Sequence, residues 1–326
     1  MKRLTKLFKS IFPALLCLFF VLPSHASHTA PKTPDYIIID SWVSGFIAGL
    51  VKNKEKRWKA AWKRANLSAR NDARIWGGLF VSDTNSTSGK RFLEVGSRFT
   101  YQGPQTGIGF FMAHFYNTVL CKVNTVSYPN GSTLLNMNVA WTGICFGNYI
   151  LAKKNSAPNP DNRIFQHEYG HYLQSRRMGF AYLVRVGLPA IMSTGVHDEH
   201  PVEVDCNREG FLYFNRINPN FQNDAGYADR KGWDFLYNPF PDTIGIKTTV
   251  GRNTFRYIDY RDSIGRAQVE SLKVKAKWFD YAGWIAFPVP AIIGVCNAVK
   301  YNREQGEGSG SGPLIIIEGP EEKKVN

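Results

Sequence analysis

The chain has 326 residues, 44% of them hydrophobic, and a formal net charge of +14. A chain of this length and composition can bury a large core, so we expect a globular domain and exclude a disordered protein. We find no internal repeat in the sequence, which excludes a repeat array.

The first 26 residues have the pattern of a signal peptide. They contain four basic residues between Lys2 and Lys9, an apolar run from Ile11 to Leu22, and the small-residue end Ser24-His25-Ala26. The run is too short to favour a permanent membrane anchor, so we expect cleavage near Ala26 and export to the periplasm or the extracellular space. Removal of the four basic residues takes the charge from +14 to about +10. We expect no nucleic-acid partner for such an exported protein.

The segment from Trp42 to Ala69 has a helical pattern with tryptophans and many basic residues. Trp42 and Phe46 are four apart, and Trp58 and Trp62 repeat that spacing. Two interpretations remain open. The more common one is a solvated basic face whose tryptophans pack inward. The other is a peripheral contact of this helix with an anionic membrane surface.

The segment from Cys121 to Lys153 has the alternating apolar pattern of strands. The turn sequence Pro129-Asn130-Gly131 predicts a hairpin, and a second bend is expected between Trp141 and Gly147. We therefore predict an α+β fold that is mainly helical, with a small antiparallel sheet directly before the next helix.

That next helix carries the motif His167-Glu168-Tyr169-Gly170-His171. Pro160-Asp161-Asn162 is a helix-start signal and Met178-Gly179 a helix end, which predicts a helix of about sixteen residues. Histidines four apart leave the same face of a helix and can bind one Zn²⁺. Glu168 can then take a proton from a water that the zinc activates. This is the apparatus of a zinc metalloprotease.

A zinc site needs a third protein ligand, and the predicted helix that begins near Glu203 offers one. Glu203 and Asn207 are four apart, so Glu203 could bind the zinc while Asn207 orients a ligand imidazole. Asp205 points away from that face and is interpreted as a surface or helix-start carboxylate. A three-histidine site that uses His197 or His200, both in the preceding loop, remains an alternative.

Several segments resemble the gluzincin-type HExxH metallopeptidases, which have a zincin-like fold. The closest likeness is to a group of bacterial exported proteins with an H-E-Y-G-H-Y-x-Q-S helix, a G-x-P turn and a later E-x-x-A-[ND]-R helix. The matching segments are His167–Ser175, Gly187–Pro189 and Glu203–Arg208, with upstream likenesses at Asp72–Phe80 and Arg98–Gln102. The likeness covers about residues 70 to 215.

The resemblance implies Zn²⁺ on His167, His171 and Glu203, with Glu168 as general base. It makes His197 a candidate to act on the transition state or to support a ligand from behind. For a side chain that stabilises the oxyanion, we expect His197 first and Tyr172 as a distant second. It also implies that a strand beside the cleft pairs with an extended peptide, and Gly147 to Ala152 is the nearest candidate. The chain departs from the family pattern at Cys206, where the pattern prefers alanine.

The remaining features complete the predicted domain organisation. The apolar segment from Trp284 to Val299 contains two prolines, which favours a buried segment over its alternative, membrane insertion. Residues 306–312 are a flexible linker, so we predict one zincin-like catalytic domain over 27–305 and a tail over 306–326. Of the four cysteines after the signal peptide, Cys206 is predicted to be a buried free thiol, which excludes two disulfides.

Two classes of function remain after these observations. The first is a zinc peptidase that acts on a peptide or protein substrate. The second is a catalytically silent zincin-like module that binds or supports other proteins at the cell surface. The intact Glu168 favours the first, because a structural zinc site has no use for a general base. The sequence does not indicate the substrate or the oligomeric state.

Overall fold

The computed structural model describes residues 38–52, 56–158, 162–193, 200–217, 246–250, 253–257, 273–282 and 289–304. By its contacts the chain divides into two units, Met1–Lys32 and Thr33–Asn326, and every described residue belongs to the second. The predicted signal peptide, linker and C-terminal tail therefore lie outside the described residues, and so does His197.

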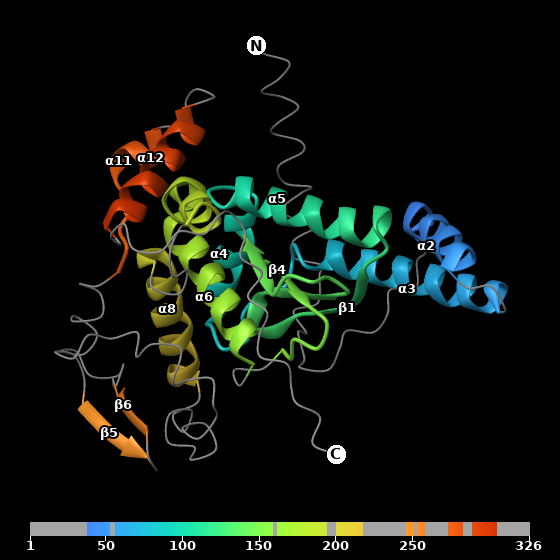
Figure 1. Cartoon of the computed structure of the whole chain (residues 1–326), viewed down its shortest axis with the longest axis horizontal. Helices are drawn as coiled ribbons and strands as arrows, with labels where there is room; N and C mark the ends of the chain where they lie inside the picture. Colours follow the sequence, from blue (N-terminus) through green and yellow to red (C-terminus); the bar gives the residue numbers. More distant parts are fainter. Residues whose placement is uncertain are drawn as a thin grey trace. The chain divides into compact units, whose positions relative to one another are not determined.

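The described part is α+β and mainly helical, as predicted (Figure 1). Its α-helices are α2 (Ile39–Lys52), α3 (Arg57–Gly77), α4 (Ser88–Arg98), α5 (Gly103–His114), α6 (Arg163–Met178), α7 (Leu188–Ile191), α8 (Pro201–Ile217), α11 (Trp278–Ala282) and α12 (Val289–Glu304). Short helical turns are η1 (Phe115–Val119), η2 (Pro129–Gly131), η3 (Gly179–Ala181) and η4 (Leu183–Gly187). The strands are β1 (Val123–Ser127), β2 (Thr133–Met137), β3 (Gly143–Phe146), β4 (Tyr149–Lys153), β5 (Ile246–Val250) and β6 (Asn253–Tyr257).

The four strands before α6 form a mixed sheet in the order β1-β2-β4-β3, so the prediction of an antiparallel sheet was wrong. β1 pairs antiparallel with β2 across the turn Pro129–Gly131, as predicted, and β3 pairs antiparallel with β4. The central strands β2 and β4 run parallel. The chain between them turns back as β3, within the segment predicted as a bend. Alternation has the same period in both kinds of sheet, so the apolar pattern could not distinguish them.

Helices cover both faces of this sheet (Figure 1). Successive side chains of a strand point to opposite faces. Leu134 and Ile150 accordingly pack in one core with residues of α6 and α8. Their neighbours Leu135 and Leu151 pack in a second core with residues of α3 and α5. The sheet is therefore a buried layer, and it holds α6 beside β3 and β4.

The helical segment predicted from Trp42 to Ala69 consists of two helices, α2 and α3, that pack against each other. Gly45 and Gly49 on α2 allow the close approach. A side chain at Gly49 would come within 2.5 Å of the Ala61 Cα atom, and one at Gly45 within 2.8 Å of the Arg64 carbonyl oxygen. The buried face of α2 is therefore its glycine face, and its large apolar side chains lie elsewhere.

The described part of the apolar C-terminal segment forms α12, which packs on η4. Asn297 is buried and donates a hydrogen bond of 2.8 Å to the Val184 carbonyl oxygen. None of the helices that the structure describes has the length and apolar character to cross a bilayer. The choice between burial and membrane insertion for the rest of Trp284–Val299 stays a prediction.

Candidate metal centre

Helix α6 carries both histidines of the motif on one face. It begins after Asn162, whose side-chain oxygen accepts a hydrogen bond of 3.0 Å from the Phe165 N–H and caps the helix. It ends at Gly179, which has a φ of 54°. These limits agree with the predicted sixteen-residue helix. The imidazole rings of His167 and His171 lie with their centroids 4.9 Å apart.

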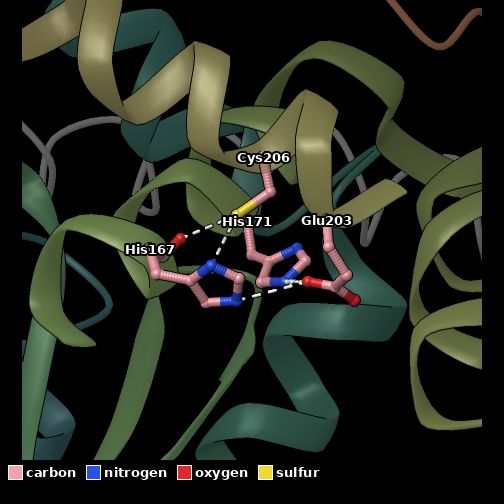
Figure 2. A group of neighbouring side chains, drawn as sticks. All are labelled: His167, His171, Glu203 and Cys206. Carbon is pink, nitrogen blue, oxygen red and sulfur yellow. Dashed lines mark hydrogen bonds and ion pairs between the residues drawn. The ribbon is translucent and has the colours of Figure 1, made fainter. Parts of the chain in front are cut away.

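Helix α8 brings Glu203 to these rings. The Glu203 Oε2 atom lies 3.0 Å from His171 Nε2 and 3.2 Å from His167 Nε2. Figure 2 shows both rings directed at this carboxylate. The close contact between helices depends on Gly170, because a Cβ there would come within 2.7 Å of the Cys206 carbonyl carbon and closer still to its oxygen. A glycine in the motif is thus required for α8 to approach α6.

The second nitrogen of each ring is held by a side-chain amide. Asn207 Oδ1 lies 2.9 Å from His167 Nδ1, the contact that the spacing of Glu203 and Asn207 predicts. Gln174 Oε1 lies 2.8 Å from His171 Nδ1. An amide oxygen can only accept, so both rings carry their proton on Nδ1. Their Nε2 atoms face Glu203 and can bind a metal ion once they have lost their protons, as in other histidine sites with an orienting partner.

Gln174 had no predicted role, and the prediction of Asp205 as a surface carboxylate was wrong. Asp205 is fully buried, and its Oδ2 atom accepts a hydrogen bond of 2.7 Å from Gln174 Nε2 and one of 2.6 Å from Arg177. Because the Gln174 amide nitrogen donates to Asp205, its oxygen must face His171. Gln174 lies three residues after His171, and this spacing on one helix face was the available signal.

Cys206 lies beside the site, on the outer edge of the His167 ring. Its Sγ atom donates a hydrogen bond of 2.9 Å to the His167 carbonyl oxygen and lies 3.7 Å from Nδ1, the nitrogen that Asn207 already holds. In Figure 2 the sulfur lies near one ring nitrogen of His167 and the Glu203 carboxylate near the other. Although Cys206 is within the same 4.8 Å cluster, we interpret it as a buried thiol that joins α8 to α6.

The three remaining donors fit a zinc ion. A tetrahedral zinc ion with bonds of about 2.0–2.1 Å holds its ligand atoms roughly 3.3 Å apart. The separations of 3.0 and 3.2 Å are close to that value. Burial lowers the pKa of His167 and of His171, but the acidic groups Cys206 and Glu203 raise it by more, so both pKa values lie above the usual 6.5. Metal binding must therefore displace protons from these rings.

Glu168 lies beside this cluster with one carboxylate oxygen available. The side chain is buried, and within the described residues its Oε2 atom has no hydrogen-bond partner. Burial raises the pKa of Glu168, and Glu203 raises it further, while the two histidines lower it. Its other oxygen is packed against Gly143 of β3, where a Cβ would come within 2.5 Å of Oε1. Gly143 thus makes room for the Glu168 carboxylate.

The strand beside Glu168 is β3 rather than the predicted segment from Gly147 to Ala152. That segment contains most of β4, which lies inside the sheet, whereas β3 is an edge strand. The Lys153 N–H donates to the Thr142 carbonyl oxygen, and hydrogen-bonded pairs alternate along an antiparallel ladder. The backbone groups of Gly143 and Cys145 therefore face the outer edge. Tyr182 donates a hydrogen bond of 3.2 Å to the Cys145 carbonyl oxygen there.

Tyr172, a candidate oxyanion donor, and His200, a candidate zinc ligand, do not join the cluster of His167, His171 and Glu203. The Tyr172 hydroxyl donates to the Glu94 carboxylate, within a buried network that joins α6 to α4, so it is not directed at the cluster as an oxyanion donor would be. His200 is fully buried directly before α8, and the cluster that the described residues form does not include it. His197 lies outside the described residues, so its predicted role stays a prediction.

Comparisons with protein-family models, with curated proteins and with solved structures find no match to this chain. The resemblance to gluzincin-type metallopeptidases therefore rests on the sequence motifs.

Proposed function

We propose that the protein is a zinc-dependent peptidase with His167, His171 and Glu203 as zinc ligands and Glu168 as general base. One observation carries the proposal. A buried carboxylate oxygen of Glu168 lies beside the cluster of donors without a hydrogen-bond partner among the described residues. Leaving a buried polar atom unpaired is costly, on the order of 1–3 kcal/mol and more for a charged group. A catalytic role, or a water or ion bound at the site, accounts for such a group, and the position of Glu168 beside the metal-binding side chains favours the catalytic role.

A zinc ion bound there would lower the pKa of a coordinated water and polarise a substrate carbonyl. Glu168 supplies the proton transfers. It takes a proton from the attacking water as the new bond to the carbonyl carbon forms, and it gives that proton to the amine nitrogen as the carbon–nitrogen bond breaks. Its raised pKa brings the carboxyl nearer to the working pH, which suits both transfers. Asn207 and Gln174 keep the ligand rings oriented.

A peptide or protein is the substrate class that the surroundings favour. The outer edge of β3 presents the backbone groups of Gly143 next to Glu168, while the Cys145 carbonyl oxygen on the same edge already accepts a hydrogen bond from Tyr182. An extended peptide can add to such an edge through main-chain hydrogen bonds. The family resemblance supports the same use of an edge strand. We also propose export to the periplasm or the extracellular space, which rests on the pattern of residues 1–26.

The arrangement favours an active enzyme over a silent structural module. A structural zinc site is normally closed by four protein ligands. Here the Glu203 carboxylate lies at Nε2 of both histidines, whereas the Cys206 thiol donates to the His167 carbonyl oxygen and lies 3.7 Å from His167 Nδ1. The fourth position is thereby left for a water molecule or for substrate.

The test compares wild type with Glu168→Gln, loaded with equal zinc, on an unbiased peptide library. We expect the same zinc content in both and cleavage products only with wild type, since loss of general acid–base catalysis lowers turnover by about 10²–10⁴-fold. The matched control is Asp40→Asn, which also replaces a carboxylate by its amide, at an exposed position on α2. Equal cleavage by wild type and Glu168→Gln, or no cleavage of any peptide by the zinc-loaded wild type, would contradict the proposal.

A further inference from the structure

The outer face of α2 exposes a continuous stripe of apolar side chains. Ile39, Val43, Ile47 and Val51 are four apart and therefore lie along one face of the helix. All four are exposed, and the end members Ile39 and Val51 expose 75% and 78% of their surface. The opposite face, with Gly45 and Gly49, is the one packed on α3. An exposed contiguous apolar stripe of this kind marks an interaction surface.

Aromatic side chains continue this surface at the contact with α3. Trp42 and Phe46 of α2 stack on each other, and Trp62 packs edge-on against both. Trp58 and Trp62 nevertheless remain 64% and 53% exposed. The interpretation that these tryptophans pack inward was therefore wrong for the pair on α3. Exposed tryptophans beside an apolar stripe are typical of elements at a membrane–water interface.

The charges next to the aromatic side chains are positive. Lys56, Arg57, Lys59 and Lys63 are all exposed at and near the start of α3. In the described residues of α2 and α3, the only exposed acidic side chain is Asp40, because Asp72 is buried. The surface thus combines apolar, aromatic and basic groups, and this combination fits an anionic lipid surface better than a protein partner of mixed charge.

A second exposed stripe lies on neighbouring elements. Ile108 and Phe111 of α5 and Phe115 and Val119 of η1 are spaced three or four apart and are all exposed. α2 contacts η1, where the Ser41 and Thr118 hydroxyl groups lie 2.7 Å apart.

We propose that the α2–α3 hairpin docks the protein on an anionic lipid surface. The apolar stripe of α2 and the tryptophans enter the headgroup boundary, and the basic residues of α3 contact lipid phosphates. The contact is peripheral, because neither helix is long and apolar enough to cross a bilayer. It is independent of the metal centre, and it would concentrate the protein at a membrane whatever reaction it performs.

The test uses the chain without residues 1–26, which belong to the separate unit Met1–Lys32. The protein is floated with vesicles of phosphatidylcholine alone or with about one-third phosphatidylglycerol. We expect binding to the anionic vesicles that weakens strongly between low and high salt, because surface charges are screened within about 10 Å at 0.1 M salt. Equal binding to neutral and anionic vesicles, or binding to neither, would overturn the proposal.

Variants at exposed positions locate the contact without disturbing the core. Lys59→Gln with Lys63→Gln should weaken partitioning by about 25-fold, since each basic residue near such a surface contributes about fivefold. Ile47→Ser with Val51→Ser should weaken it by about tenfold or more. The matched controls are Lys90→Gln with Lys154→Gln and Phe92→Ser with Leu93→Ser, which alter equally exposed residues on other elements and should bind as wild type does. Equal effects of test and control variants, or self-association of the protein in place of lipid binding, would refute the assignment.

Discussion

Replacement of Gly170 by alanine should separate α8 from α6 and weaken zinc binding. A Cβ at this position would come within 2.7 Å of the Cys206 carbonyl carbon, whereas ordinary contacts begin at 3.4 Å. The obstacle is backbone, so it cannot rotate away, and the two helices must move apart by at least about 0.7 Å at this point. Glu203, one turn before Cys206 on α8, moves with it.

The expected loss of zinc affinity follows from the small displacement that a metal ligand tolerates. Ligand distances must usually hold within about 0.2 Å, so a displacement of 0.7 Å removes most of what Glu203 contributes. We expect zinc affinity to fall by more than about 100-fold, the upper end of the loss for an orienting partner alone. The free energy of unfolding should also fall, by about 1–3 kcal/mol as for other overpacked contacts.

The assay is competition for zinc with a chromophoric chelator, together with urea denaturation of the metal-free protein. Gly107→Ala is the matched control, because it lies in α5 and a Cβ there meets nothing within 4 Å. It should leave zinc affinity unchanged and raise stability slightly, by about 0.5–1 kcal/mol. Zinc binding by Gly170→Ala as tight as that of wild type would refute the reasoning about the contact between α6 and α8.

Three further predictions separate the roles of neighbouring residues. Gly143→Ala should bind zinc as wild type does but lose turnover, because its Cβ would displace the Glu168 carboxylate and not a zinc ligand. Metal content and peptide cleavage are measured on the same sample, and full activity would contradict the prediction. Gln174→Ala should lower zinc affinity by about 10–100-fold in chelator competition, since His171 loses its orienting partner; unchanged affinity would count against that role. Burial holds the pKa of Glu168 above its unfolded value, so its contribution to stability is present at low pH and is lost as pH rises through the folded pKa. The metal-free Glu168→Gln variant should therefore be more stable than wild type in urea at pH 7, and the difference should shrink towards pH 4; a variant less stable at pH 7 would oppose this.

The helices that carry the site could be predicted from the sequence, because the residues that start, end and pattern each helix lie within that helix. The capping residue Asn162, the stop at Gly179 and the four-residue spacing of His167 and His171 all lie within one helix. The pairing of Glu203 with Asn207 follows from the same periodicity on the next helix. These predictions needed only the geometry of a single helix.

The arrangement between elements could not be predicted in the same way. Whether β2 and β4 run parallel, and which strand lies at the edge, depends on contacts that an alternating pattern does not encode. The burial of Asp205 depends on Gln174, Arg177 and the Val274 N–H, which are all distant in sequence. The sequence around Asp205 does not reveal these partners, so its pattern indicated a surface carboxylate.

An open zinc site differs from a closed one in its ligands, which X-ray absorption at the zinc edge of the metal-loaded protein distinguishes. We expect two imidazole nitrogens from His167 and His171 and two oxygens, one from Glu203 and one from water, with no sulfur in the coordination shell. Glu203→Ala should then change the oxygen shell and weaken binding, while Cys206→Ala should leave the spectrum unchanged. A sulfur ligand at about 2.3 Å that disappears in Cys206→Ala would show a closed site and contradict the catalytic interpretation.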